Sequence, residues 1–161
     1  MKTTKKGFTL IELMIVVSII TFLAILAVPQ LLHYKAKAFQ AEVAMNLASL
    51  HTAQQAFFAQ NGYYTTVLTG DKGLNWKPAG YSTDGNHNFY YTYGFNTADA
   101  QEGVHYFTGK LKAPKDKLGA TNASKEGFAA GAAGDVAGKN KMDVWVVNEA
   151  RKIENVQSGL D

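Results

Sequence analysis

Hydrophobic residues are concentrated at the front of this chain, in one run that is long enough to cross a lipid bilayer. Residues 8–32 include a single formally charged side chain, Glu12, and a single helix breaker, Pro29. At about 1.5 Å per residue, a helix of this length spans ~37 Å, more than the ~30 Å hydrocarbon core of a membrane. The pattern therefore predicts a helix of transmembrane length.

The helix is expected to continue beyond the apolar run, because residues 33–61 contain no Pro or Gly. A mostly apolar stripe recurs there at spacings of three and four residues, at Phe39, Val43, Leu47, Leu50, Gln54 and Phe57. Such a stripe predicts a face that packs against a sheet. The pair Asn61-Gly62 is a typical stop signal. One helix over residues 8–61 would be ~80 Å long, which a compact domain cannot cover.

Downstream of Gly62 the sequence changes to short β-prone pieces separated by turn residues. Four strands are predicted, at residues 87–95, 104–111, 127–133 and 143–148. Residues 119–124 are predicted to be a linker, and residues 157–161 a frayed end. The expected fold class is α+β, with one very long N-terminal helix packed against a roughly four-stranded antiparallel sheet.

Charge and cysteine content limit the functional classes. The 161 residues carry 16 Lys+Arg and 13 Asp+Glu, and Lys2, Lys5 and Lys6 account for the whole excess of +3. Since no other basic cluster is present, we expect no specific nucleic-acid binding. The chain has no cysteine, so packing and hydrogen bonds must hold its folded part together.

The sequence contains no recognisable catalytic pattern. Its four histidines lack metal-ligand spacing, and no nucleophile elbow, P-loop or dinucleotide fingerprint is present. We therefore expect no enzyme and no cofactor. Asp135, Asn140 and Asp143 are weak candidates for calcium ligands, because Lys139 and Lys141 interrupt them and the dense acidic spacing of a calcium loop is missing. Ordinary turn residues are the favoured interpretation.

The N-terminal stretch KKGFTLIELMIVV raises the question of what offsets the charge of Glu12. A carboxylate in hydrocarbon is unfavourable by roughly 2.5–3.5 kcal/mol at a helix centre. A secretory signal peptide would have a shorter apolar core and a small-residue cleavage site. A plain membrane anchor leaves the acid facing lipid. A cut between Gly7 and Phe8 would instead expose an α-amine one helical turn from Glu12, able to pair with it in the same chain or in a neighbouring one.

The residues GFTLIEL at 7–13, behind a short lysine-bearing leader, resemble the class III signal sequence of type IV pilins and of the related pseudopilins of type II secretion. The resemblance implies that prepilin peptidase cuts after Gly7 and methylates the amine of Phe8. It also implies that Glu12 offsets the amine of an adjacent subunit during assembly. The tripeptide Asp143-Val144-Trp145 is a looser likeness, in a late strand of the head.

The resemblance implies a division of the chain into four parts. These are a leader at 1–7, the transmembrane and later filament-core half of the helix at 8–34, its amphipathic half at 35–61, and an antiparallel β head at 62–161.

Pro29 lies deep in the apolar run and lacks the N–H that a helix needs. Its ring also clashes with the carbonyl of Ile25, so a helix through it is kinked or locally opened. In the family that this sequence resembles, a proline at this depth goes with a segment that loses helical structure in the filament, here residues 21–29. Many members have Gly near the start of that segment, whereas this chain has Thr21. A simple kink in a membrane helix is the alternative.

The implied function is that of a structural subunit, a type IVa-like major pilin. The precursor would reside in the inner membrane and bind prepilin peptidase and the inner-membrane pilus assembly platform. The processed subunit would then polymerise with itself into a filament on the bacterial surface. Adhesion, twitching motility and DNA uptake are the uses such a filament implies. A pseudopilin of a type II secretion system is one alternative, and a monomeric membrane-anchored binding module is another.

Overall fold

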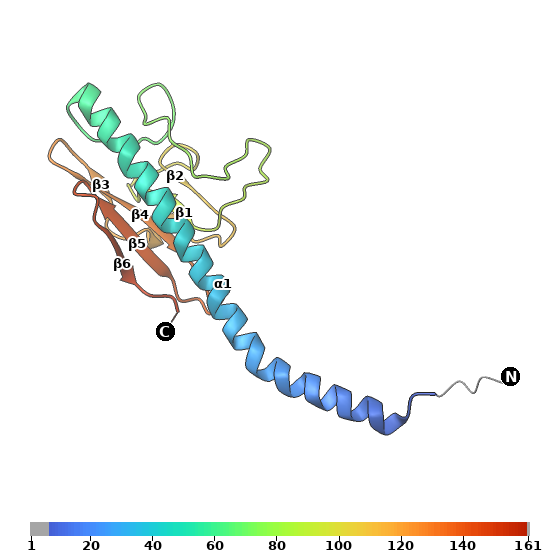
Figure 1. The fold of residues 1–161 in the computed structure, drawn as a ribbon. Coiled ribbons are helices and arrows are strands. Elements are labelled where there is room, and N and C mark those ends of the chain that lie inside the picture. The colour runs from blue at the N-terminus through green and yellow to red at the C-terminus, as the bar shows by residue number, and fades with distance from the viewer. Residues whose placement is uncertain (1–6, 161) are drawn as a thin grey trace. The chain divides into compact units, whose positions relative to one another are not determined.

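The structure is a computed structural model that describes residues 7–160 (Figure 1). It begins with one long helix, α1 (Leu10–Asn61), followed by a sheet of six short strands and one 3-10 turn, η1 (Lys115–Lys117). The strands are β1 (Thr92–Gly94), β2 (Tyr106–Phe107), β3 (Asn122–Ala123), β4 (Phe128–Gly134), β5 (Asp143–Asn148) and β6 (Ile153–Gln157). The α+β class is confirmed, and the sheet has six strands instead of about four.

The predicted long helix is confirmed, with small differences at its ends. It starts at Leu10, two residues later than expected, because Thr9 caps it, and it ends at Asn61 as the sequence indicates. Gly62 follows with a φ of 76°, in the left-handed region that glycine adopts without strain. The chain divides into two compact units, one up to Lys35 and one from Ala36 onward, and α1 belongs to both.

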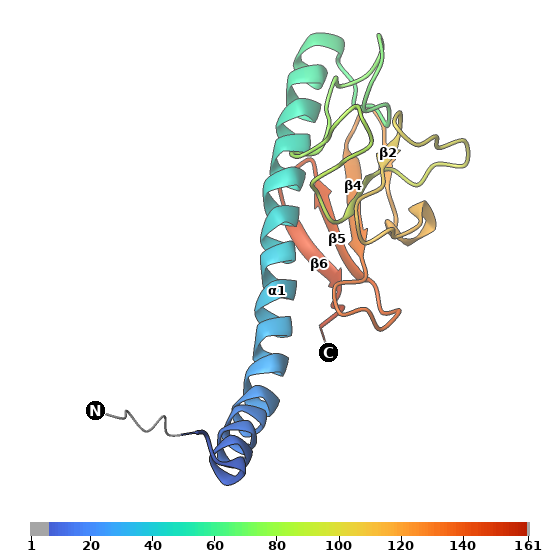
Figure 2. The same ribbon diagram turned by 90° about the vertical axis from the view of Figure 1, so that its right-hand side faces the viewer.

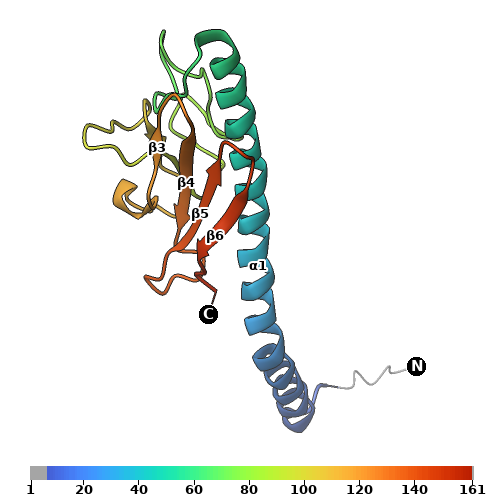
Figure 3. The same cartoon turned by 90° about the vertical axis from the view of Figure 1, so that its left-hand side faces the viewer.

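The sheet of the second unit is antiparallel, with the strand order β2-β1-β4-β5-β6, and β3 pairs with β4. The longest ladder joins β4 and β5 over the register from Ala129 opposite Asn148 to Gly134 opposite Asp143. Figures 2 and 3 show the portion of α1 after residue 36 lying along one face of this sheet. The four predicted strands correspond to β1, β2, β4 and β5, which pair antiparallel as β1 with β2 and β4 with β5.

Two segments differ from the sequence-based expectation. The predicted linker contains the short strand β3, and the tail after Asn148 forms the edge strand β6. The frayed end predicted after Gln157 is wrong for the described residues, because Gly159 is buried and its N–H donates a 3.1 Å hydrogen bond to Asp143. A buried acceptor thus orders a terminus that the sequence alone would leave loose.

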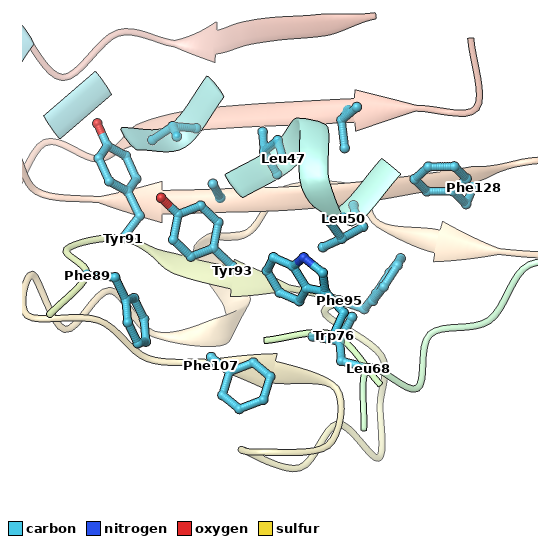
Figure 4. Close-up of a cluster of buried hydrophobic side chains, with 14 of the residues drawn as sticks. Leu47, Leu50, Leu68, Trp76, Phe89, Tyr91, Tyr93, Phe95, Phe107 and Phe128 are labelled. Carbon is cyan, nitrogen blue, oxygen red and sulfur yellow. The ribbon is translucent and has the colours of Figure 1, made fainter. Parts of the chain in front are cut away.

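The core lies between α1 and the sheet and is rich in aromatic rings (Figure 4). The predicted stripe supplies its helical side, since Val43, Leu47 and Leu50 are fully buried. Against them pack Leu68, Trp76, Phe89, Tyr91, Tyr93, Phe95, Phe107 and Phe128. Gln54, the polar member of the stripe, is also buried and exchanges two hydrogen bonds with the backbone of Thr65. Burial of these rings is the main stabilising contribution to the head.

Candidate assembly site

The first turn of α1 is closed by a reciprocal pair of side chains, Thr9 and Glu12. The Thr9 backbone N–H and hydroxyl donate to Oε2 of Glu12 at 2.8 and 2.7 Å, and the Glu12 N–H donates to the Thr9 hydroxyl at 3.2 Å. This is a capping box, in which residues three apart satisfy backbone donors at the start of a helix. The T-x-x-E spacing that encodes it is visible in the sequence, although the sequence-based hypotheses considered only an amine as partner for the acid.

Glu12 retains capacity for a further partner. Both bonds from Thr9 reach Oε2, and Oε1 accepts no hydrogen bond from any residue in the range 7–160. The carboxylate also lies at the positive end of the helix dipole, where a negative charge is favoured. Gly7 and Phe8 precede the cap outside the helix and are exposed. The predicted processing residues, Gly7 and Phe8, therefore precede the capped first turn and are exposed.

The N-terminal part of α1 exposes apolar side chains on every side. Every residue of 7–35 is exposed, and the exposed fraction of its large apolar side chains ranges from 44% at Val16 to 77% at Leu10. By length and composition, α1 is apolar enough to cross a membrane. An apolar surface of this extent has to be covered by lipid or by protein.

The segment around Thr21 and Pro29 is helical in the structure. The Thr21 hydroxyl donates to the carbonyl of Val17 at 2.8 Å, as the Ser18 hydroxyl does to that of Met14. These bonds satisfy both hydroxyls inside the helix, although such back-bonding favours bending. Opening of residues 21–29 in a filament stays a prediction.

The carboxylates of the two acidic calcium candidates, Asp135 and Asp143, accept hydrogen bonds from other residues. Asp135 accepts hydrogen bonds from the backbone N–H groups of Lys139 and Asn140, at 3.1 and 2.9 Å, within its own loop. Asp143 points into the protein interior. Among residues 7–160, no three His, Cys, Asp or Glu side chains are grouped so that they could hold a metal ion.

Asp143 is instead the centre of a buried hydrogen-bond cluster, which we call the Asp143 clasp. Its five donors are Gln40 and Tyr91 at 3.2 and 2.5 Å, Trp145 at 2.7 Å, Asn155 at 2.8 Å and Gly159 at 3.1 Å. They come from α1, the residue before β1, β5, β6 and the C-terminal segment. The clasp therefore connects the helix, the sheet and the chain end in a head that has no disulfide.

The electrostatics of the clasp favour an ionised aspartate. Burial alone would raise the pKa of Asp143, but the donors Tyr91, Trp145, Asn155 and Gly159 outweigh it and lower that pKa below the ordinary 3.8. Burial, together with the bond to Asp143, raises the pKa of Tyr91, so the phenol stays a donor.

A second carboxylate, Glu42 on α1, accepts hydrogen bonds of 2.9 Å from the hydroxyl of Tyr93 and the backbone N–H of Tyr90. Glu42 therefore holds α1 against β1 and the residues just before that strand.

Comparisons with known proteins agree with the N-terminal site. Residues 2–28 match the family model described as the prokaryotic N-terminal methylation motif. The chain is 48% identical over 60 residues to the type IV major pilin protein PilA of Myxococcus xanthus, covering 37% of this chain and 27% of that protein. It is 41% identical over 73 residues to the type IV major fimbrial protein FimA of Dichelobacter nodosus, covering 45% and 41%.

Likeness extends to secretion proteins. The chain is 35% identical over 78 residues to the type II secretion system core protein G of Klebsiella michiganensis, covering 48% of this chain and 55% of that protein. The matches thus span between about a quarter and about half of the relatives' own length. The methylation motif, these relatives and the long apolar helix together support a type IV pilin family.

Proposed function

We propose that this chain is a major pilin, a structural subunit that polymerises through the N-terminal half of α1 into a type IV pilus filament. The observation that carries the proposal is the position of Glu12, a lone acid in the first turn of an apolar helical segment that is exposed up to Lys35, four residues after Phe8. The match to the N-terminal methylation motif, and relatives that are named as major pilins, support it.

The proposed mechanism begins with the precursor in the inner membrane, which residues 8–34 span as a helix. Prepilin peptidase removes residues 1–7 and methylates Phe8, which leaves a cationic amine beside the capped first turn. The free Oε1 of Glu12 then pairs with the amine of an adjacent copy as the assembly platform extracts the subunit. One charge pair sets the axial stagger, while the apolar side chains supply adhesion by packing. The head at 62–161, held on residues 35–61, forms the outer surface used in adhesion, motility or DNA uptake.

Substitutions of Glu12 test this proposal. Glu12→Gln keeps the capping box, because glutamine also serves at that position, and removes only the charge. In cells that carry the pilus machinery, we expect Glu12→Gln and Glu12→Ala precursors to be cleaved while sheared surface fibres fall at least about tenfold, since one pair of desolvated charges corresponds to more than ~1.4 kcal/mol. Glu154→Ala, which removes an exposed acid paired with Lys152 in the head, is the matched control and should leave fibre yield unchanged. Normal piliation of Glu12→Ala would contradict the mechanism.

A pseudopilin of a secretion system is the second candidate, because the similarity to core protein G covers 48% of this chain. Abundance separates the two. Surface fibres made chiefly of this chain favour the major pilin, whereas trace periplasmic amounts together with a secretion defect on deletion favour the pseudopilin.

A further inference from the structure

The apolar stem, residues 8–32, contains five polar side chains, and four of them are satisfied within their own helix. Thr9 and Glu12 bond to each other, and the hydroxyls of Ser18 and Thr21 donate to backbone carbonyls one turn earlier. Gln30 is the exception, since its side-chain amide makes no hydrogen bond to any of residues 7–160. It carries two donors and an acceptor into an otherwise apolar surface.

The same part of the stem contains a backbone acceptor that lacks its usual helical partner. Pro29 has no N–H, so it cannot make the helical hydrogen bond to the carbonyl of Ile25, four residues earlier. The helix nevertheless continues through this position. A side-chain donor at Gln30 and a backbone acceptor at Ile25 therefore lie five residues apart on one exposed helix.

The surroundings decide what can satisfy these groups. Gln30 shares a shallow groove with the apolar side chains of Leu23, Leu26 and Leu31, which are 57%, 60% and 67% exposed. Lipid chains can cover the leucines, but they have no group that bonds an amide or a carbonyl. In the membrane, Gln30 lies near the end of the stem, where interfacial water is within reach. Packing into a fibre removes that water, and a buried amide without a partner is unfavourable by about 1–3 kcal/mol.

We propose that Gln30 is an inter-subunit hydrogen-bonding residue, whose amide donates to the Ile25 carbonyl of a second copy of this chain in the fibre. The inference rests on the proposed function and adds a second polar contact to the charge pair at Glu12. Ile25 and Gln30 are about 7.5 Å apart along the axis of an intact helix and farther apart if residues 21–29 open in the fibre, so in either case the bond requires the neighbour to be shifted along the fibre axis. Such a head-to-tail contact leaves a free donor at one end and a free acceptor at the other, as an open helical polymer needs.

The first test compares the thermal dissociation of sheared fibres. Gln30→Met keeps the length of the side chain and removes its hydrogen bonds, and Ser18→Ala is the matched control, because Ser18 is satisfied within its own helix. We expect Gln30→Met fibres to release subunits at a temperature about 5 °C lower, as loss of about one buried hydrogen bond does for a small domain, and Ser18→Ala fibres to match the wild type. Gln30→Met fibres as stable as the wild type overturn the inference.

A second test is disulfide cross-linking between introduced cysteines. The chain has no cysteine of its own, so every disulfide that forms involves an introduced residue. In Ile25→Cys/Gln30→Cys, the two Cα atoms of one chain are roughly 8.7 Å apart in the helix and farther apart if the segment is extended, beyond the ~7 Å limit for a disulfide, so any bond formed joins two copies. Mild oxidation of fibres should give a ladder of covalent oligomers, whereas either single variant should stop at dimers. A double variant that also stops at dimers contradicts the proposed contact. If the wild-type chain forms no fibres at all, the proposed function fails, and this inference fails with it.

Discussion

The hydroxyl of Tyr91 donates a 2.5 Å hydrogen bond to the carboxylate of Asp143, 52 residues later in the chain. The same carboxylate holds Asn155 and Gly159, so one side chain connects the entry to β1 with the edge strand β6 and the C-terminal segment. Since the chain has no disulfide, this clasp is the closest equivalent of a cross-link in its head.

Asp143→Asn should therefore destabilise the head. The substitution keeps the size of the side chain but turns an NH2 group toward neighbouring donors, and hydrogen bonds to a charged group contribute about 1.5–3 kcal/mol each. We expect the free energy of unfolding to fall by about 3 kcal/mol, measured by chemical denaturation of the full chain in detergent micelles. Asp99→Asn, at an exposed residue whose carboxylate makes no hydrogen bond to any of residues 7–160, is the control and should change it by less than about 0.5 kcal/mol. Equal stabilities of the two variants would contradict a structural role for the clasp.

The clasp should also make stability depend on pH in the acid range. Asp143 has a pKa lowered below 3.8 in the folded head, so the unfolded chain binds its proton first as pH falls. Its stabilising contribution is complete above about pH 4 and is lost as the pH drops through the folded-state pKa. A pH series of denaturation curves should show a steeper acid loss for the wild type than for Asp143→Asn. Parallel curves would show that another group controls the acid transition.

The capping box gives a prediction for the start of the stem. Thr9→Val removes the hydroxyl that both donates to and accepts from Glu12, whereas Thr9→Ser keeps it. Loss of an N-terminal cap is unfavourable by about 0.5–2 kcal/mol. Counts of surface fibres should therefore fall with Thr9→Val and stay near the wild-type level with Thr9→Ser. Equal fibre counts for Val and Ser would show that the box is dispensable.

Local patterns in the sequence were enough to predict the long helix and four of the six strands, β1, β2, β4 and β5. The stripe from Val43 to Leu50 has helical spacing, and β5 is an unbroken β-prone segment, so local chemistry alone predicts both. Strand β6 was missed because Ile153–Gln157 is mostly polar and exposed, and its strand conformation depends on pairing with β5. No local rule places it there.

The N-terminal site could be proposed from the sequence, whereas the polar contacts inside the head could not. Gly7, Phe8 and Glu12 lie within six residues of one another, so their spacing is known without a fold. The clasp brings together residues as far apart as Gln40 and Gly159, and only the folded chain shows that Asp143, taken from sequence for a weak calcium ligand, faces inward. Long-range polar contacts of this kind leave no periodic signal.

Intact-mass and fragment mass spectrometry of sheared surface fibres identifies both the first residue of the assembled subunit and any modification of its amine. We expect the fibres to consist chiefly of this chain, beginning at Phe8 with one methyl group on its amine. Assembled fibres in which residues 1–7 are still attached would contradict this prediction, because no free amine would then exist for Glu12 of the neighbouring subunit.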